Sequence, residues 1–158
     1  MKKKTMRALF AFLFVLGLVA GLLVPLDYKT IKKKISGEGL KPDIIDVSKR
    51  LGQLDQQTDY FKYSVLAQTD IGAVEILRLD DKIPLHKHPK ETHYVYVYKG
   101  RAKGTIGGVT SEIGQGQLVV IPAGAPHSFE RIGDSPVELI AFSSPPFMPN
   151  DTVWLDKK

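Results

Sequence analysis

The stretch HKHPKETHYVYVYKG at residues 86–100 contains His86, His88 and His93, and the remaining histidine of this 158-residue chain is His127. Imidazole is the commonest metal ligand in proteins, and this spacing fits one divalent ion. The chain has no cysteine, which excludes a thiolate site and a disulfide framework. The histidine pattern therefore predicts a metal site.

The positions of the four histidines predict how they converge. His86 and His88 are two residues apart, so both imidazoles can face the same side of an extended strand. His93 begins the next β-prone run and can face this pair. The rigid turn sequence PAGAP at 122–126 brings His127 to a fixed place. Residues from three separate strands would then form one preformed site.

Short β-prone runs separated by Gly, Pro, Asp or Asn follow residue 60, and this pattern predicts an all-β sandwich or barrel. Before them, Asp43 is a candidate cap for a short helix, since Ile44, Val47, Leu51 and Leu54 have helical spacing. The expected strands are 60–66, 73–79, 93–98, 101–106, 117–121, 128–132 and 137–142.

Two motifs in this order resemble the cupin superfamily. The first reads H-x-H, a gap of four, His93, six residues and Gly100; the second reads Gly116, P-x-G at 122–124 and His127. The resemblance covers about residues 60–147. It implies a double-stranded β-helix, or jelly-roll barrel, with one metal near the barrel axis held by His86, His88, His93 and His127.

The chain departs from the family pattern at two positions. His93 stands where the first motif has glutamate, and Arg131 stands where the second often ends in asparagine. Four neutral imidazoles would leave the metal its full charge, and these ligands admit Fe, Mn, Ni, Cu or Zn rather than Mg or Ca. Glu91 shares the strand face of His93, so it is either an alternative ligand or an acceptor for a histidine N–H. The spacing to Gly100 favours His93.

Alternation along residues 93–98 places the tyrosines on the face opposite His93. These tyrosines either pack beneath the N-terminal part of the chain or form a contact between two copies. Because small cupins commonly dimerise, the resemblance favours a homodimer. Phe129 and Arg131 share the strand face of His127 and are candidates for a substrate pocket. Arg131 would either bind a carboxylate or phosphate there or form a surface salt bridge.

The N-terminal segment predicts export. Residues 8–24 are an apolar run that follows Lys2, Lys3, Lys4 and Arg7. Residues 1–26 are therefore expected to form a hydrophobic helix that is a signal peptide or a membrane anchor, with a linker at 27–41 and the cupin domain at 42–158. Either alternative places the domain in the periplasm or another extracytoplasmic space. From residue 41 onward the chain has 14 basic and 15 acidic residues, so no nucleic-acid partner is expected.

Two classes of function fit these observations. One is a metal-dependent enzyme, such as an oxygenase, that acts on a small organic molecule. The other is a non-catalytic extracytoplasmic module that binds a small ligand or a metal. The family includes both enzymes and binding modules, so the resemblance does not choose between them.

Overall fold

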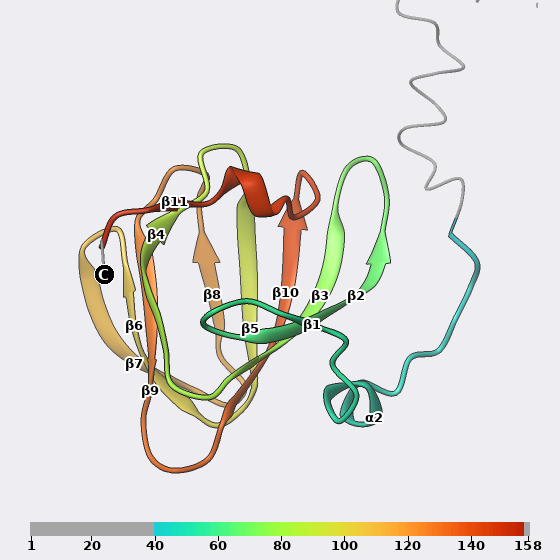
Figure 1. The fold of residues 1–158 in the computed structure, drawn as a ribbon, viewed down its shortest axis with the longest axis horizontal. Helices are drawn as coiled ribbons and strands as arrows, with labels where there is room; N and C mark the ends of the chain where they lie inside the picture. The colour runs from blue at the N-terminus through green and yellow to red at the C-terminus, as the bar shows by residue number, and fades with distance from the viewer. Residues whose placement is uncertain (1–39, 157–158) are drawn as a thin grey trace, which may run out of the picture.

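The computed structural model describes residues 40–156, and these residues form two antiparallel β-sheets that enclose one hydrophobic core (Figure 1). The first sheet has six strands, in the order β1 (Gln56–Gln57), β2 (Lys62–Gln68), β3 (Ala73–Leu79), β10 (Val137–Ser144), β5 (Thr92–Lys99) and β8 (Leu118–Ile121). The second has five strands, in the order β11 (Val153–Trp154), β4 (Lys82–Lys87), β9 (His127–Arg131), β6 (Arg101–Ile106) and β7 (Val109–Gly114). This arrangement confirms the prediction of an all-β jelly roll.

The core forms because alternate residues of each strand face inward. Val95 and Val97 of β5 are buried beside Leu139 of β10, and Phe129 of β9 and Ile113 of β7 belong to the same core. The expected strands at 73–79 and 101–106 match β3 and β6. β7 was not expected, because its first four residues are all exposed and show no apolar alternation.

The strand expected at 60–66 begins two residues later, at Lys62, because Thr58 holds the preceding residues in a turn. The Thr58 N–H and hydroxyl both donate to the Phe61 carbonyl, at 2.9 and 3.1 Å. The Thr58 Oγ1 also accepts hydrogen bonds from the N–H groups of Tyr60 and Phe61. A side chain that satisfies local backbone groups in this way competes with strand pairing.

The helix predicted near residue 43 is displaced and shorter. It is α2 (Val47–Leu51), and its N-cap is Asp46, whose Oδ1 accepts from the Lys49 N–H at 2.9 Å. Asp43 instead accepts from the N–H of Ile44, which lies outside the helix and is 99% exposed. α2 packs against β3. No helix within residues 40–156 is long and apolar enough to span a membrane, and the hydrophobic helix predicted for residues 1–26 lies outside the described residues.

Two motif glycines have clear backbone roles. Gly100, between β5 and β6, has φ of 86°, and a Cβ there would lie 2.8 Å from the Pro136 carbonyl oxygen. Gly124 has φ of 78° in the turn before β9, and its N–H donates to the His88 carbonyl at 2.7 Å. Positive φ is costly for residues that have a Cβ. These glycines therefore allow the turns that hold the histidine-bearing segments together.

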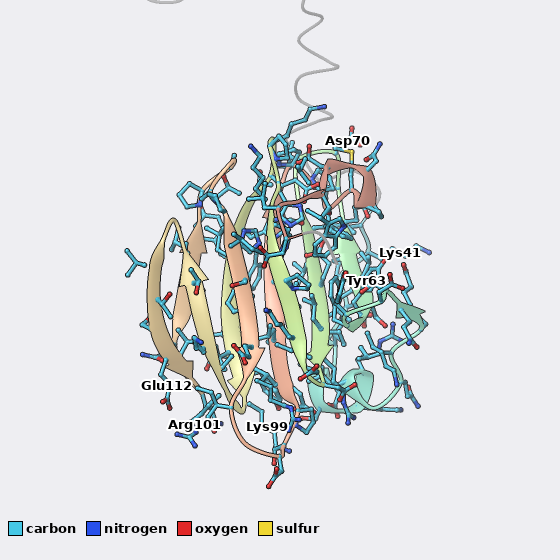
Figure 2. The ribbon with its side chains drawn as sticks, turned by 60° about the vertical axis from the view of Figure 1, so that its left-hand side comes forward. Lys41, Tyr63, Asp70, Lys99, Arg101 and Glu112 are labelled. Atoms are coloured by element: carbon cyan, nitrogen blue, oxygen red, sulfur yellow. The ribbon has the colours of Figure 1, made fainter. Side chains whose placement is uncertain are left out.

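Polar side chains lie on the outside of the barrel. Arg101 and Glu112 project outward from β6 and β7 and form an ion pair at 2.8 Å (Figure 2). Both side chains are more than half exposed, so this pair contributes at most about 1 kcal/mol to stability. Glu112 is therefore a surface acid remote from the core, and it provides a control position for variants of buried acids.

Candidate metal centre

The structure brings all four histidines together at one end of the barrel. His86 is near the end of β4 and His88 directly follows this strand, while His93 lies near the start of β5 and His127 begins β9. His86 and His127 are opposite one another in the β4–β9 register, with ring centroids 4.1 Å apart. The His88 ring lies 4.4 Å from that of His93 and 5.3 Å from that of His127. All four residues are at most 9% exposed.

Backbone carbonyls orient two of the imidazoles. The Nδ1 of His86 lies 2.8 Å from the Pro84 carbonyl oxygen, and the Nδ1 of His127 lies 3.0 Å from that of Ala125. Because a carbonyl only accepts, each Nδ1 carries the proton and each Nε2 retains its lone pair. Metal-binding histidines in proteins usually have such a partner for the other ring nitrogen.

Two groups of side chains are close enough to hold an ion. In the first, ligand atoms of His86, His88 and His127 lie within 4.8 Å of one another, and in the second the same holds for His88, Glu91 and His93. His88 belongs to both groups. The two groups therefore form one continuous set of donors. Its four histidines, His86, His88, His93 and His127, are called the histidine cluster.

Glu91 is 1% exposed and directly contacts this cluster. Its Oε2 lies 2.9 Å from the His93 Nε2 and 3.9 Å from the His88 Nδ1. Its Oε1 accepts a hydrogen bond from the Met148 N–H at 2.7 Å. In this arrangement Glu91 is the acceptor for a histidine N–H, one of the two roles that its sequence position suggested.

Burial favours the neutral form of three imidazoles, those of His86, His88 and His127. Loss of solvation lowers the pKa of His88 to about 2 and that of His127 to about 3, and the neighbouring imidazoles add to both shifts. Burial also lowers the pKa of His86, although its bond to the Pro84 carbonyl opposes this shift. Neutral imidazole is the form that binds metal. Protons therefore compete weakly for these three side chains at neutral pH.

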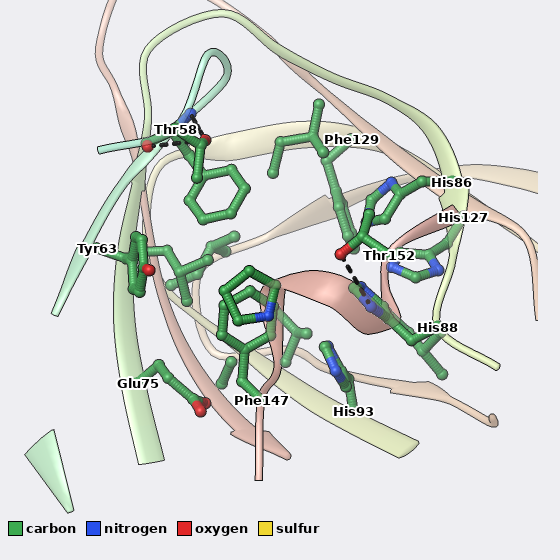
Figure 3. Close-up of a pocket in the computed structure, with 18 of the residues that line it drawn as sticks. Thr58, Tyr63, Glu75, His86, His88, His93, His127, Phe129, Phe147 and Thr152 are labelled. Atoms are coloured by element: carbon green, nitrogen blue, oxygen red, sulfur yellow. Dashed lines mark hydrogen bonds between the residues drawn. The ribbon is translucent and has the colours of Figure 1, made fainter. Parts of the chain in front are cut away.

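The histidine cluster lines one side of a cavity of about 150 Å³, while Glu75 and Tyr63 lie on the opposite side (Figure 3). Most of the other lining side chains are apolar or aromatic, including Phe129 and Phe147. Phe129 thus has the pocket position that the sequence predicted. Sequence reasoning missed Glu75, although its place among the apolar residues of 73–79, on the inward face, was a usable signal.

Arg131 does not line this cavity, contrary to the expectation from its strand parity. Its guanidinium donates to the Gly133 carbonyl in the loop after β9. The surface salt bridge considered for Arg131 is absent among residues 40–156. The Arg131 side chain is long enough to reach the loop after β9, so the face of the strand on which the residue lies does not fix the position of its guanidinium.

A small jelly roll with histidines from three strands at one end of the barrel defines the class of protein. A family model for the cupin domain matches residues 74–143. An uncharacterised protein of Methanocaldococcus jannaschii is 32% identical over 84 residues, which cover 53% of this chain and 67% of that protein. The chain belongs to the cupin superfamily.

Solved structures show the same fold. A double-stranded β-helix protein of Klebsiella pneumoniae superposes with a TM-score of 0.60 and 18% identity, covering 74% of this chain and 100% of that one. Oxalate decarboxylase of Bacillus subtilis superposes with a TM-score of 0.55 and 20% identity, covering 66% of this chain and 30% of that one. At sequence identities of 18% and 20%, these comparisons show only that the fold is shared.

Proposed function

We propose that this protein binds one divalent transition metal through His86, His88, His93 and His127. The observation that carries this proposal is the convergence of four buried imidazoles, two of which are oriented by backbone carbonyls. Nitrogen ligands of this kind select Fe, Mn, Ni, Cu or Zn. The Nε2 of His93 bonds to Glu91 in this structure, so His93 would bind through Nδ1 or after a small ring rotation.

A metal-dependent enzyme acting on a small organic molecule, such as an oxygenase, is the activity that we favour. A bound metal would act as a Lewis acid beside the cavity. The chain itself contributes a largely apolar chamber, with the histidine cluster along one wall. The alternative is a non-catalytic module that uses the same chamber to bind a small ligand or a metal.

The metal site is tested by comparing His88→Ala with Lys87→Ala in the full chain. These neighbours point to opposite faces, and only His88 lies in the cavity. We expect His88→Ala to lose most of the bound metal in elemental analysis, while Lys87→Ala retains it. Circular dichroism should show that both variants keep their β-structure. Full metal retention in a folded His88→Ala variant would exclude the site.

The identity of the bound metal distinguishes the enzyme from the non-catalytic binding module. Protein purified from its native compartment should contain redox-active iron or copper if oxygen chemistry is its function. Zinc, or the absence of metal, would favour the binding module. The measurement is elemental analysis together with electron paramagnetic resonance, which detects Cu(II) and high-spin Fe(III).

We further propose that the domain functions outside the cytoplasm. This proposal is supported by the basic residues before the apolar run at 8–24. Cell fractionation followed by mass spectrometry of the mature chain would test it. A full-length protein in the membrane fraction would indicate an anchor, a shortened soluble protein would indicate a signal peptide, and a full-length cytoplasmic protein would exclude export.

A further inference from the structure

The size of the cavity limits what it can hold. Its volume is about 150 Å³. An engineered apolar cavity of roughly this volume, about 150 Å³ in another protein, binds benzene. The enclosed part of this partly open space therefore accommodates a single six-membered ring with few substituents.

The charge of the lining limits the ligand further. No lysine or arginine is among the described residues that line the cavity, and Arg131 has its guanidinium on the loop after β9. Removing an anion from water without a counter-charge costs many kcal/mol. The two buried acids near the cluster, Glu75 and Glu91, supply no positive charge in either protonation state. The protein lining therefore offers no counter-charge to a carboxylate, and the only one available would be a metal held by the histidine cluster.

Glu75 supplies one polar contact within this apolar surface. It is 4% exposed on β3, and its Oε1 accepts a hydrogen bond from the Ser143 hydroxyl at 2.8 Å. Ser143 in turn accepts from the Phe147 N–H at 3.0 Å, so the carboxyl group is held against both β10 and the segment that follows it. Burial raises the pKa of the Glu75 carboxyl, which favours its neutral form. A fixed carboxyl of this kind can pair with a hydroxyl group.

We propose that the cavity binds an uncharged single-ring molecule that bears a hydroxyl group, with the ring against Phe129 and Phe147 and the hydroxyl hydrogen-bonded to Glu75. This inference deepens the proposed function, since the ligand would occupy the chamber that the histidine cluster lines. It specifies a neutral phenol-like or cyclic-alcohol ligand rather than a small carboxylate.

The test uses Trp154, the only tryptophan of the chain, which lines the same cavity. Its indole N–H gives a single resolved signal in proton–nitrogen NMR of the labelled full chain. Phenol, toluene and benzoate are titrated at pH 7 against metal-free protein, because a metal on the histidines would itself attract benzoate. We expect phenol to shift this signal and to bind at least about tenfold more tightly than benzoate or toluene, equivalent to about 1.4 kcal/mol. Equal or tighter binding of benzoate would overturn the proposal.

A variant tests the role of Glu75. Glu75→Leu should weaken phenol binding about tenfold and leave toluene binding unchanged, because only phenol loses a hydrogen bond. Glu112→Leu, at the exposed acid on β7, should bind both ligands as the unmodified protein does. If Glu75→Leu does not fold, the ligand series on the unmodified chain still decides. If the protein selects phenol but fails to take up metal when metal is offered, only the metal proposal is refuted. If it takes up metal but does not select phenol, only the present proposal is refuted.

Discussion

At the scale of single residues, the pairing of Glu91 with His93 distinguishes this site from the glutamate-containing motif of the family. Glu91 contacts His93, His88 and the Met148 N–H, so it connects the histidine cluster to the C-terminal segment. A carboxylate on the far nitrogen of an imidazole increases the basicity of that ligand. Glu91 can therefore strengthen a metal site without binding the metal.

This arrangement predicts an order of effects for two variants. His93→Gln should reduce metal affinity more than Glu91→Gln, because the first removes a ligand and the second removes only its partner. The loss in Glu91→Gln should be about 10- to 100-fold. Competition with a chromogenic chelator measures both affinities. If Glu91→Gln had the larger effect, the carboxylate would be the ligand.

The depressed histidine pKa values predict how stability depends on pH. Unfolded His88 and His127 take up protons below about pH 6.5, whereas the folded forms resist protonation until about pH 2 and 3. The unfolded state therefore binds more protons in this window, and the metal-free protein loses stability as the pH falls from 6.5 towards 3. Each histidine contributes about 1.4 kcal/mol per pH unit.

Urea denaturation of the metal-free protein between pH 7.5 and 4 measures this slope. His88→Gln should show a slope shallower by about 1.4 kcal/mol per pH unit below pH 6.5, since it removes one such proton. Lys87→Ala is the control and should follow the unmodified protein. Parallel curves for all three proteins would show that His88 is not kept neutral.

At the scale of elements, residues 145–156 form a strap along one side of the cavity. The strap contains the 3₁₀-helix η2 (Pro149–Asp151) and β11, which pairs with β4 so that Trp154 lies opposite His86. Phe147, Thr152 and Trp154 of the strap line the cavity. Side chains from the body of the domain hold it in place: Glu91 bonds to Met148 and Ser143 to Phe147.

Asp151 is a further residue that attaches the strap to the body of the domain. It is 7% exposed, and its Oδ2 accepts from the Lys90 N–H at 2.9 Å. Asp151→Ala should destabilise the protein by about 1–3 kcal/mol and increase hydrogen exchange at Lys90. Asp134→Ala, in an exposed loop, should have little effect. Unchanged exchange at Lys90 in Asp151→Ala would show that this contact does not fasten the strap.

The element β5 shows which parts of the site were predictable. Its inward residues His93, Val95 and Val97 are buried, and Tyr94 is 42% exposed, as the alternation in the sequence predicted. The C-terminal tail is expected from the sequence to be a strap across the barrel, but the contacts of the strap and the place of Glu75 were not predictable in this way. Their positions depend on pairing between β3 and β10 and between β4 and β11, which join residues between 58 and 70 positions apart.

At the scale of the whole molecule, the outer face of the six-stranded sheet carries exposed apolar side chains. In the register of β8, β5 and β10, Val120 lies opposite Tyr94 and Tyr94 opposite Phe142. Leu118 is 56% exposed and Val120 is 51% exposed. The tyrosine row is partly packed, since the Tyr98 hydroxyl hydrogen-bonds to Ser48 of α2 at 2.7 Å. Both alternatives considered for the tyrosines thus retain support.

The homodimer therefore stays a prediction, with this face as its interface. Phe142→Lys should convert the dimer to a monomer, because it places a charge among apolar side chains. Val109→Lys is the matched control: Val109 is 72% exposed, but it lies at the β6–β7 hairpin. Light scattering after size-exclusion chromatography measures the mass. A monomeric unmodified protein, or a dimeric Phe142→Lys variant, would contradict this interface.

The sequence by itself determined most of the strand pattern, the turn glycines and the four histidines, because alternation, turn chemistry and ligand spacing are properties of neighbouring residues. Only the tertiary structure decided that Glu91 bonds to His93, that Arg131 lies outside the cavity, and that Glu75 lies within it. Burial and the shape of a cavity depend on segments that the chain brings together from distant positions. The pKa values of the histidines follow from that burial, so they too emerge only when the barrel closes.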